Sequence, residues 1–430
     1  MSILKIRQVF ILLSIVFLLT CCKNNKDFAS FIHGDKESYP DNYFTEFIND
    51  KTSPEIIATL ETKIVDNVQV STIHFTSKLD SNHVNNIYAY YMTPQTEGKC
   101  PAMLILHGGG QSADSYYDLG LKFANRGYVC LIPDLPGIAD PGRVDREGKG
   151  SSGEWMNYPY ARNHFNVNPN AKSSSIYEGM VVSIQSFYLL KNNAKVFEDK
   201  IGVRGLSWGG YATTILSGLL GDQIAAALAV YGCGYFDLPS WFKTYIDRLS
   251  TEGQEEWLSN LDAGRFANRI EAPFFFMAAS NDTYFWPPAM MATYNELENK
   301  KYIVFSPNND HSLSNLPAAD ITEFMFFNHY LIGGESRPGE ITVLNHTTDT
   351  VYNQEVEFMV ESDVSLLNVK VYSSSSADEW KDRKWVSSVP IETTAGHYKF
   401  SLAAVNDTTK KDWYIIATDT RKVSFGTLIY

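Results

Sequence analysis

The segment Gly205-Leu206-Ser207-Trp208-Gly209 has the residue types and the spacing for nucleophilic chemistry. In a G-x-S-x-G pattern the serine lies at the tip of a sharp turn between a strand and a helix, where its hydroxyl projects above the sheet. Glycines two residues away on either side avoid a collision with the backbone, and Gly210 lets the following helix pack closely. A serine hydroxyl alone is a poor nucleophile, so the chain must also supply a base, an acid and oxyanion donors.

His311 is the expected base. Four of the nine histidines follow Ser207, and the order serine, acid, histidine is typical of this kind of turn. His311 follows the last apolar strand of the predicted sheet, whereas His346 and His397 fall in a later β-rich region and His329 falls in a predicted helix.

Asp282 is the expected acid, because it directly follows the predicted strand Pro273–Ala279. Asp237, after the preceding strand, is the alternative. Asp310 adjoins His311 too closely to reach back to its ring easily. Asp282 also fits a purely local role in an Asx turn, which would carry no catalytic meaning.

The segment His107-Gly108-Gly109-Gly110-Gln111 follows a continuous apolar strand and is the expected oxyanion loop. Glycines let the backbone N–H groups approach a substrate carbonyl. We expect Gly109 or Gly110 to supply one oxyanion donor and the N–H of Trp208, directly after the nucleophile, to supply the other. The alternative is a tight turn without a catalytic role.

These residues lie in a region of alternating strands and helices, which favours an α/β fold with a mostly parallel sheet. We place this domain at residues 62–333, with a leading antiparallel hairpin before the buried strands. The expected elements are strands near 68–75, 86–92, 102–106, 128–133, 201–204, 225–231, 273–279 and 301–305, and helices near 115–126, 173–192, 211–220, 289–299 and 318–331.

Two long segments without periodicity, 138–172 and 232–268, follow strand ends and are rich in aromatic residues. Loops of this length in a compact domain are usually functional. In the first of them Trp155, Tyr158, Tyr160 and His164 are candidate substrate contacts; the alternative is surface decoration.

The helical pattern stops at the linker Gly333–Gly339, and short alternating runs then recur. About seven strands are expected, near 341–344, 355–360, 367–372, 384–386, 398–402, 413–417 and 423–429. Their spacing predicts a small immunoglobulin-like β-sandwich at residues 338–430.

The first residues resemble a bacterial lipoprotein signal. Lys5 and Arg7 precede an apolar run that ends at Cys21 and Cys22. We therefore expect a signal peptide at 1–21, lipidation of Cys21 or Cys22, and a polar tether at 22–61 with a short helix near 44–60. The expected location is the bacterial cell envelope, at the outer membrane or surface. An ordinary cleaved secretory signal, and thus a periplasmic or secreted protein, is the alternative.

The composition limits which ligands, cofactors and macromolecular partners the protein is expected to bind. The net charge of −13 argues against nucleic acid, whose phosphates require a basic patch. The remaining cysteines, Cys100, Cys130 and Cys233, lie in or beside apolar runs and are expected to be buried thiols. No Cys or His cluster has metal-ligand spacing, so we expect neither a metal nor another cofactor.

Residues 65–332 resemble α/β-hydrolases, in particular acetyl xylan esterases, dienelactone hydrolases and prolyl-oligopeptidase-like enzymes. The resemblance rests on the segments around Gly108 and Ser207 together with 230–234, 280–287 and 307–311. The region of Lys384 and Trp385 is similar to a β-module in secreted hydrolases of the PhoPQ-regulated type. The likeness implies Ser207 as nucleophile, Asp282 as acid and His311 as base. It departs from dienelactone hydrolases, whose nucleophile is cysteine.

The expected activity is therefore hydrolysis of carboxylic esters through an acyl-enzyme on Ser207. The resemblance and the aromatic insertions favour an acylated carbohydrate as substrate. A prolyl-oligopeptidase-like peptidase is the first alternative, although residues 22–61 are too short for the propeller of those enzymes. The second is a non-enzymatic surface protein that binds through its β-domain.

Overall fold

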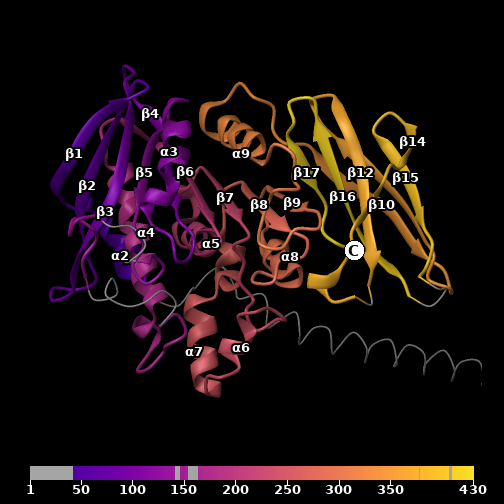
Figure 1. Cartoon of the computed structure of the whole chain (residues 1–430), viewed down its shortest axis with the longest axis horizontal. Helices are drawn as coiled ribbons and strands as arrows, with labels where there is room; N and C mark the ends of the chain where they lie inside the picture. Colours follow the sequence, from indigo (N-terminus) through magenta and orange to yellow (C-terminus); the bar gives the residue numbers. More distant parts are fainter. Residues whose placement is uncertain (1–41, 141–145, 154–162, 377, 406–408) are drawn as a thin grey trace, which may run out of the picture. The chain divides into compact units, whose positions relative to one another are not determined.

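The computed structural model describes residues 42–140, 146–153, 163–376, 378–405 and 409–430. A nine-stranded sheet in the order β1-β2-β3-β5-β4-β6-β7-β8-β9 forms its first part (Figure 1). Its strands are β1 Ile56–Val65, β2 Val68–Lys78, β3 Val84–Pro94, β4 Cys100–Leu106, β5 Val129–Pro133, β6 Val196–Leu206, β7 Ala226–Val230, β8 Phe274–Ala279 and β9 Lys301–Ser306.

The sheet is antiparallel at its start and parallel from β5 onward. β1, β2, β3 and β5 pair antiparallel, and the expected leading hairpin is β2–β3, with Val68 opposite Pro94. β5, β4, β6, β7, β8 and β9 pair in parallel. Apart from the exposed first half of β6, the parallel strands are buried almost throughout, as their continuous apolar runs predicted.

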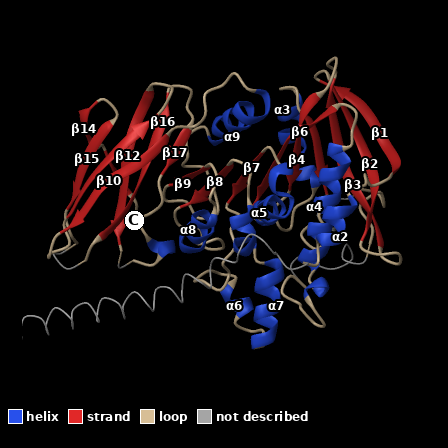
Figure 2. Ribbon diagram, turned by 180° about the vertical axis from the view of Figure 1, so that it is seen from behind, coloured by secondary structure: helices blue, strands red, loops and turns tan. Residues whose placement is uncertain are grey.

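Helices cover both faces of this sheet, α3 and α9 on one side and α4, α5 and α8 on the other (Figures 1 and 2). The short helices α6 and α7, in the second insertion, lie side by side in both views. The helices are α2 Thr45–Asp50, α3 Tyr117–Ala124, α4 Ser175–Lys191, α5 Trp208–Leu220, α6 Lys243–Ile246, α7 Thr251–Leu261, α8 Pro287–Glu296 and α9 Ala319–Phe327.

The order of the strands reverses at β4, which pairs with β5 on one side and β6 on the other. The loops after β4 and after β6 therefore leave the same edge of the sheet next to each other. In open α/β sheets, ligands bind at the carboxyl ends of the strands at such a switch point.

The start of the sheet differs from the expectation of a helix near 44–60. The helix α2 ends at Asp50, and β1 begins at Ile56, within the range expected for the tether. Nearly every residue of β1, one of the two edge strands of the sheet, is exposed. A strand exposed on both faces has no alternation of apolar and polar residues, so the usual sequence signal was missing.

The last part of the chain forms two four-stranded antiparallel sheets, β10-β11-β15-β14 and β13-β12-β16-β17. Their strands are β10 Glu340–Thr348, β11 Gln354–Glu361, β12 Leu366–Ser375, β13 Val386–Ser388, β14 Ile391–Thr394, β15 His397–Leu402, β16 Lys411–Asp419 and β17 Ser424–Gly426. Side chains from both sheets share one core, which includes Phe358, Phe400, Trp413 and Phe425.

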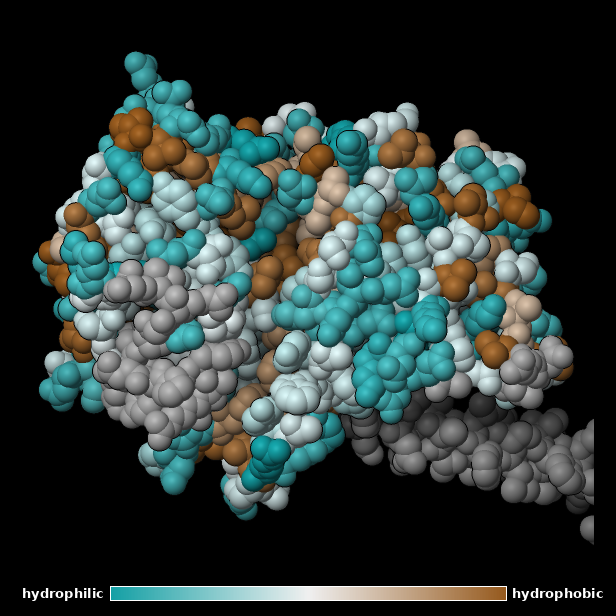
Figure 3. All heavy atoms as spheres, in the orientation of Figure 1, coloured by the Kyte–Doolittle hydropathy of each residue, from teal (hydrophilic) through white to brown (hydrophobic). Residues whose placement is uncertain are grey.

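These sheets contact the larger one directly. The N–H of Ser424 donates to the hydroxyl of Thr322 on α9 over 3.0 Å. The ring centroids of Phe305 on β9 and Tyr414 on β16 are 5.7 Å apart. On the face in Figure 3, apolar side chains form separate groups among hydrophilic ones. Within the described residues, no helix is both long and apolar enough to cross a membrane.

Candidate active site

Ser207 lies between the end of β6 and the first residue of α5, in a backbone conformation that L-residues rarely adopt, with φ 56° and ψ −121°. The turn is fixed on both sides, because the N–H of Ser207 donates to Val230 (2.8 Å) and its carbonyl accepts from Tyr211 (2.9 Å). A Cβ on Gly205 would overlap the carbonyl of Gly209, and a Cβ on Gly209 would overlap that of Leu106. The two glycines are therefore required by the close approach of the backbone.

Three side chains from separate strand ends form one hydrogen-bonded chain. His311 Nε2 lies 2.9 Å from Ser207 Oγ, and His311 Nδ1 lies 2.8 Å from Asp282 Oδ2. An ionised carboxylate only accepts, so Nδ1 carries the proton that is shared with Asp282. Nε2 then accepts from the serine hydroxyl, which is the arrangement that a general base requires.

Asp282 is almost fully buried, with 1% of its side chain exposed. Its other oxygen, Oδ1, accepts from the N–H groups of Tyr284 (2.8 Å) and Phe285 (2.9 Å). These bonds satisfy the buried carboxylate and fix its rotation. Asp282 therefore forms the local turn through Oδ1 and the bond to His311 through Oδ2 at the same time, so the turn does not exclude a catalytic role.

The loop after β4 is held by hydrogen bonds to backbone groups of the segment that follows β5. Burial lowers the pKa of His107, so its ring is neutral, and its Nε2 accepts from the N–H of Leu135 (2.9 Å). The N–H of Gly110 donates to the carbonyl of Ile138 (2.9 Å). Because that N–H is already engaged, Gly109 is the better of the two candidates for an oxyanion donor. Trp208 is the first residue of α5, where backbone N–H groups have no partner within the helix.

A cavity of about 420 Å³ opens over Ser207 and His311. Its glycine side is formed by Gly108, Gly109 and Gln111, and its opposite walls are largely aromatic, with Phe165, Trp208, Trp241, Phe242, Tyr245 and Tyr284. Trp241 and Tyr284 are 51% and 44% exposed, with ring centroids 6.2 Å apart. The cavity therefore offers a buried polar end and two exposed rings.

Trp208 has its indole packed away from solvent, at 3% exposure. Its ring lies against those of Phe242 (4.9 Å between centroids) and His164 (4.7 Å). This packing holds Trp208 in place, and its backbone N–H is one of the two expected oxyanion donors.

The other residues considered as acid or base have hydrogen-bond partners of their own. Asp237 pairs with Arg265 over 2.8 Å, and Asp310 accepts from the N–H of Thr283 (2.8 Å). His329 Nδ1 donates to the carbonyl of Glu335. None of these side chains is hydrogen-bonded to the ring of His311 in the described structure.

His164 is the one aromatic candidate of the 138–172 segment that falls within the described residues; Trp155, Tyr158 and Tyr160 lie outside them. Its ring is buried, lines the cavity and donates from Nε2 to the carbonyl of Gly137 (2.7 Å). Burial lowers its pKa to about 4. It therefore acts as a neutral wall residue.

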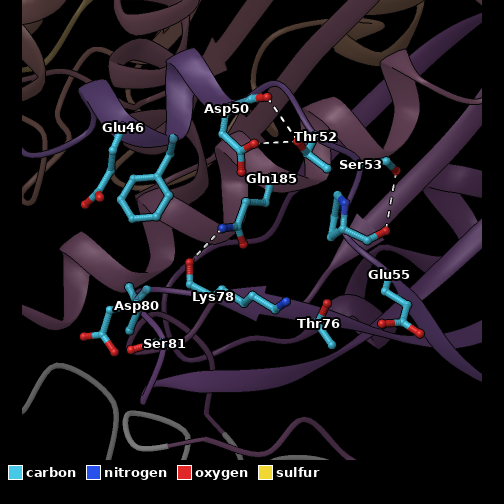
Figure 4. Close-up of a pocket in the computed structure, with 13 residues that line it drawn as sticks. Glu46, Asp50, Thr52, Ser53, Glu55, Thr76, Lys78, Asp80, Ser81 and Gln185 are labelled. Carbon is cyan, nitrogen blue, oxygen red and sulfur yellow. Dashed lines mark hydrogen bonds between the residues drawn. The ribbon is translucent and has the colours of Figure 1, made fainter.

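A second cavity, of about 510 Å³, shares no lining residue with the first (Figure 4). It lies between α2 with the segment that follows it, the end of β2 with the turn after it, and Gln185 of α4. Gln185 donates to the carbonyl of Lys78 (2.9 Å), and Asn192 donates to that of Lys51 (2.9 Å). These bonds attach neighbouring segments to α4, and we assign this cavity no part in the chemistry.

The sheet, its covering helices and the turn at Ser207 define an α/β-hydrolase fold. The structure is similar to acetyl xylan esterase 1 from Thermoanaerobacterium sp., with a TM-score of 0.54 and 20% identity over 66% of this chain and 91% of that one. It is equally similar to an acetyl xylan esterase from Paenibacillus sp., with a TM-score of 0.54 and 20% identity over 70% of this chain and 98% of that one. The predicted fold class is confirmed.

Sequence comparison adds two partial matches. Residues 220–383 match the family described as PhoPQ-activated pathogenicity-related protein. The chain is also 22% identical to dipeptidyl aminopeptidase BIII of Pseudoxanthomonas mexicana over 202 residues, which is 44% of this chain. That alignment spans 26% of the peptidase. The chain is thus related in sequence to an enzyme named as a peptidase and in fold to enzymes named as esterases.

Proposed function

We propose that the protein is a serine hydrolase that cleaves carboxylic esters. The observation that carries the proposal is the hydrogen-bonded chain from Ser207 through His311 to the buried Asp282. Two adjacent hydrogen bonds with a strained serine at one end match the requirements of nucleophilic catalysis.

In the proposed mechanism Ser207 Oγ attacks the ester carbonyl carbon while His311 Nε2 takes the hydroxyl proton. The negative charge that develops on the carbonyl oxygen is stabilised by the N–H groups of Gly109 and Trp208. His311 then returns the proton to the departing alcohol, which leaves an acyl group on Ser207. Water, deprotonated by His311, hydrolyses this acyl-enzyme, releases the acid and restores the serine. Asp282 stabilises the imidazolium in both halves.

We infer an acylated carbohydrate as the substrate class. The two exposed rings of Trp241 and Tyr284 stand at the cavity that contains Ser207, and aromatic faces pack well against sugar rings. The similarity in fold to two enzymes named acetyl xylan esterase supports the same inference. A peptidase is the second candidate, favoured by the alignment with the dipeptidyl aminopeptidase.

The test compares short-acyl nitrophenyl esters, an acetylated xylo-oligosaccharide and dipeptidyl nitroanilides, with Ser207→Ala as the control. We expect hydrolysis of the esters and release of acetate from the oligosaccharide, both abolished in Ser207→Ala. Faster cleavage of the nitroanilides would favour the peptidase. Turnover of none of these substrates would favour the non-enzymatic surface protein.

We further propose that the protein is anchored in the bacterial cell envelope through a lipid on Cys21 or Cys22. The basis is the charged and apolar leader that ends at these cysteines. Expression with labelled palmitate, compared between the native protein, Cys21→Ser and Cys22→Ser, tests the anchor. We expect one of the two substitutions to abolish labelling. An unlabelled native protein recovered in the soluble fraction would contradict the anchor.

A further inference from the structure

The segment 380–385, between β12 and β13 of the C-terminal sheets, contacts the loops that carry Asp282 and His311. Asn281, next to Asp282, donates from Nδ2 to the carbonyls of Arg383 (2.7 Å) and Trp380 (3.1 Å). The amide is nearly buried, at 7% exposure. The loop that carries Asp282 is therefore hydrogen-bonded to a part of the chain about a hundred residues away in sequence.

The loop of His311 is bonded to the same segment by a reciprocal pair. Asn308 donates from Nδ2 to the carbonyl of Trp385 (2.8 Å) and accepts at Oδ1 from its N–H (2.7 Å). Asn308 adopts a left-handed backbone conformation, with φ 53°. Asparagine tolerates this conformation better than most residues.

The two loops are also bonded to each other. The N–H of Asn308 donates to Ser280 Oγ (2.9 Å), whose hydroxyl donates to Asn281 Oδ1 (2.7 Å). On the other side, the N–H and hydroxyl of Thr283 both donate to Asp310 (2.8 and 2.9 Å). Two sets of hydrogen bonds thus join the loops: one links Asn281 and Asn308, whose amides face 380–385, and the other links Thr283 and Asp310, the neighbours of Asp282 and His311.

The segment 380–385 is itself firmly anchored. Arg383 is buried and donates from Nη1 to Asp412 on β16 (2.5 Å), and its guanidinium lies 3.6 Å from the centroid of Trp380. The ring of Trp385, 3% exposed, packs at 4.9 Å from that of Tyr414. The segment is thus a rigid support for the bonds that it makes.

We propose that the C-terminal sheets are part of the catalytic unit, with Asn281 and Asn308 as positioning residues that set the distance between Asp282 and His311. The inference rests on the proposed function of this triad. Catalytic groups must be held close to their productive geometry, and a misplacement of about 1 Å costs on the order of 100-fold in rate. The β-domain would then act on catalysis without touching the substrate.

The test uses Asn281→Ala and Asn308→Gly in the full-length protein. Glycine is chosen at 308 because it accepts the positive φ without strain, so the variant removes only the amide. Thr322→Val is the matched control, since it removes a buried hydrogen bond between the same two parts of the chain, to Ser424, away from the triad loops. For each protein we measure kcat and KM for nitrophenyl acetate, the rate at which a fluorophosphonate modifies Ser207, and the Tm.

We expect kcat and the phosphonylation rate to fall together by about 10- to 100-fold in both asparagine variants, with KM changed by less than about threefold. Thr322→Val should keep both rates, whatever it does to the Tm. Unchanged rates in the asparagine variants, or an equal loss in Thr322→Val, would overturn the inference. If Asn281→Ala does not fold, Asn308→Gly decides alone. A native protein that is not phosphonylated would instead refute the proposed function.

Discussion

Asp282→Asn is expected to lower kcat for ester hydrolysis on the order of 10⁴-fold without loss of folding. The reason is that the two carboxylate oxygens of Asp282 have different hydrogen-bond partners. Oδ1 accepts from the N–H groups of Tyr284 and Phe285, so an amide in this position must keep its oxygen there. Its NH₂ group then faces His311 Nδ1, which is 2.8 Å away in the native structure.

Two donors cannot share that contact, so the ring of His311 must take the other tautomer, with the proton on Nε2. A protonated Nε2 cannot accept the proton of Ser207, which lies 2.9 Å away. The lost charge also removes the stabilisation of the imidazolium in the transition state. Both effects act on the chemical step, so we expect kcat to fall and KM to change little.

The assay is steady-state hydrolysis of nitrophenyl acetate, with urea unfolding to compare stability. Asp237→Asn is the control, because that carboxylate pairs with Arg265 near the surface and should affect kcat by less than about twofold. A loss below tenfold in Asp282→Asn, or an equal loss in Asp237→Asn, would refute the assignment of the acid.

Three further predictions concern the scaffold. Glu323→Ala leaves the buried Arg204 without its two-bond partner, so urea unfolding should show a loss of about 3–5 kcal/mol; a loss below about 1 kcal/mol would contradict this. The pKa of His164 is lowered to about 4 from an ordinary 6.5, so the unfolded chain binds more protons between these values and stability falls as the pH falls from 6.5 to 4. The contribution is about 3 kcal/mol, and His164→Asn should flatten ΔG against pH over this window, whereas an unchanged slope would contradict the assigned burial. Gly209→Ala places a Cβ against the carbonyl of Leu106, and we expect a protein that is inactive or unfolded by circular dichroism, whereas near-native kcat would contradict the elbow geometry.

The geometry that brings the candidate residues together was predictable in large part, because these residues follow strand ends. Ser207, Asp282 and His311 each lie in the loop or turn that follows a strand with an apolar run, and parallel strands bring their carboxyl ends to one edge. The sequence did not decide between Gly109 and Gly110, since both lie in one glycine run. Only the fold turns the N–H of Gly110 toward Ile138.

The features that the sequence did not predict, two strands and one set of long-range contacts, leave only a weak pattern in the local sequence. β1 and β14 are exposed edge strands, so neither buries one face and neither shows a clear alternation. The contacts of Asn281 and Asn308 join loops to a segment far along the chain, and an asparagine in a loop usually serves only its own turn. Such long-range pairing depends on how the two parts of the chain pack, which residue spacing does not encode.

Whether Ser207 is an activated nucleophile is tested by covalent modification of the native protein with a fluorophosphonate, followed by mass spectrometry of the digested product. We expect one adduct, on the peptide that contains Ser207, and none in Ser207→Ala. We also expect strongly reduced labelling in His311→Ala, because the base that activates the hydroxyl is gone. An unmodified native protein, or an adduct on a different residue, would contradict the claim that Ser207 is an activated nucleophile.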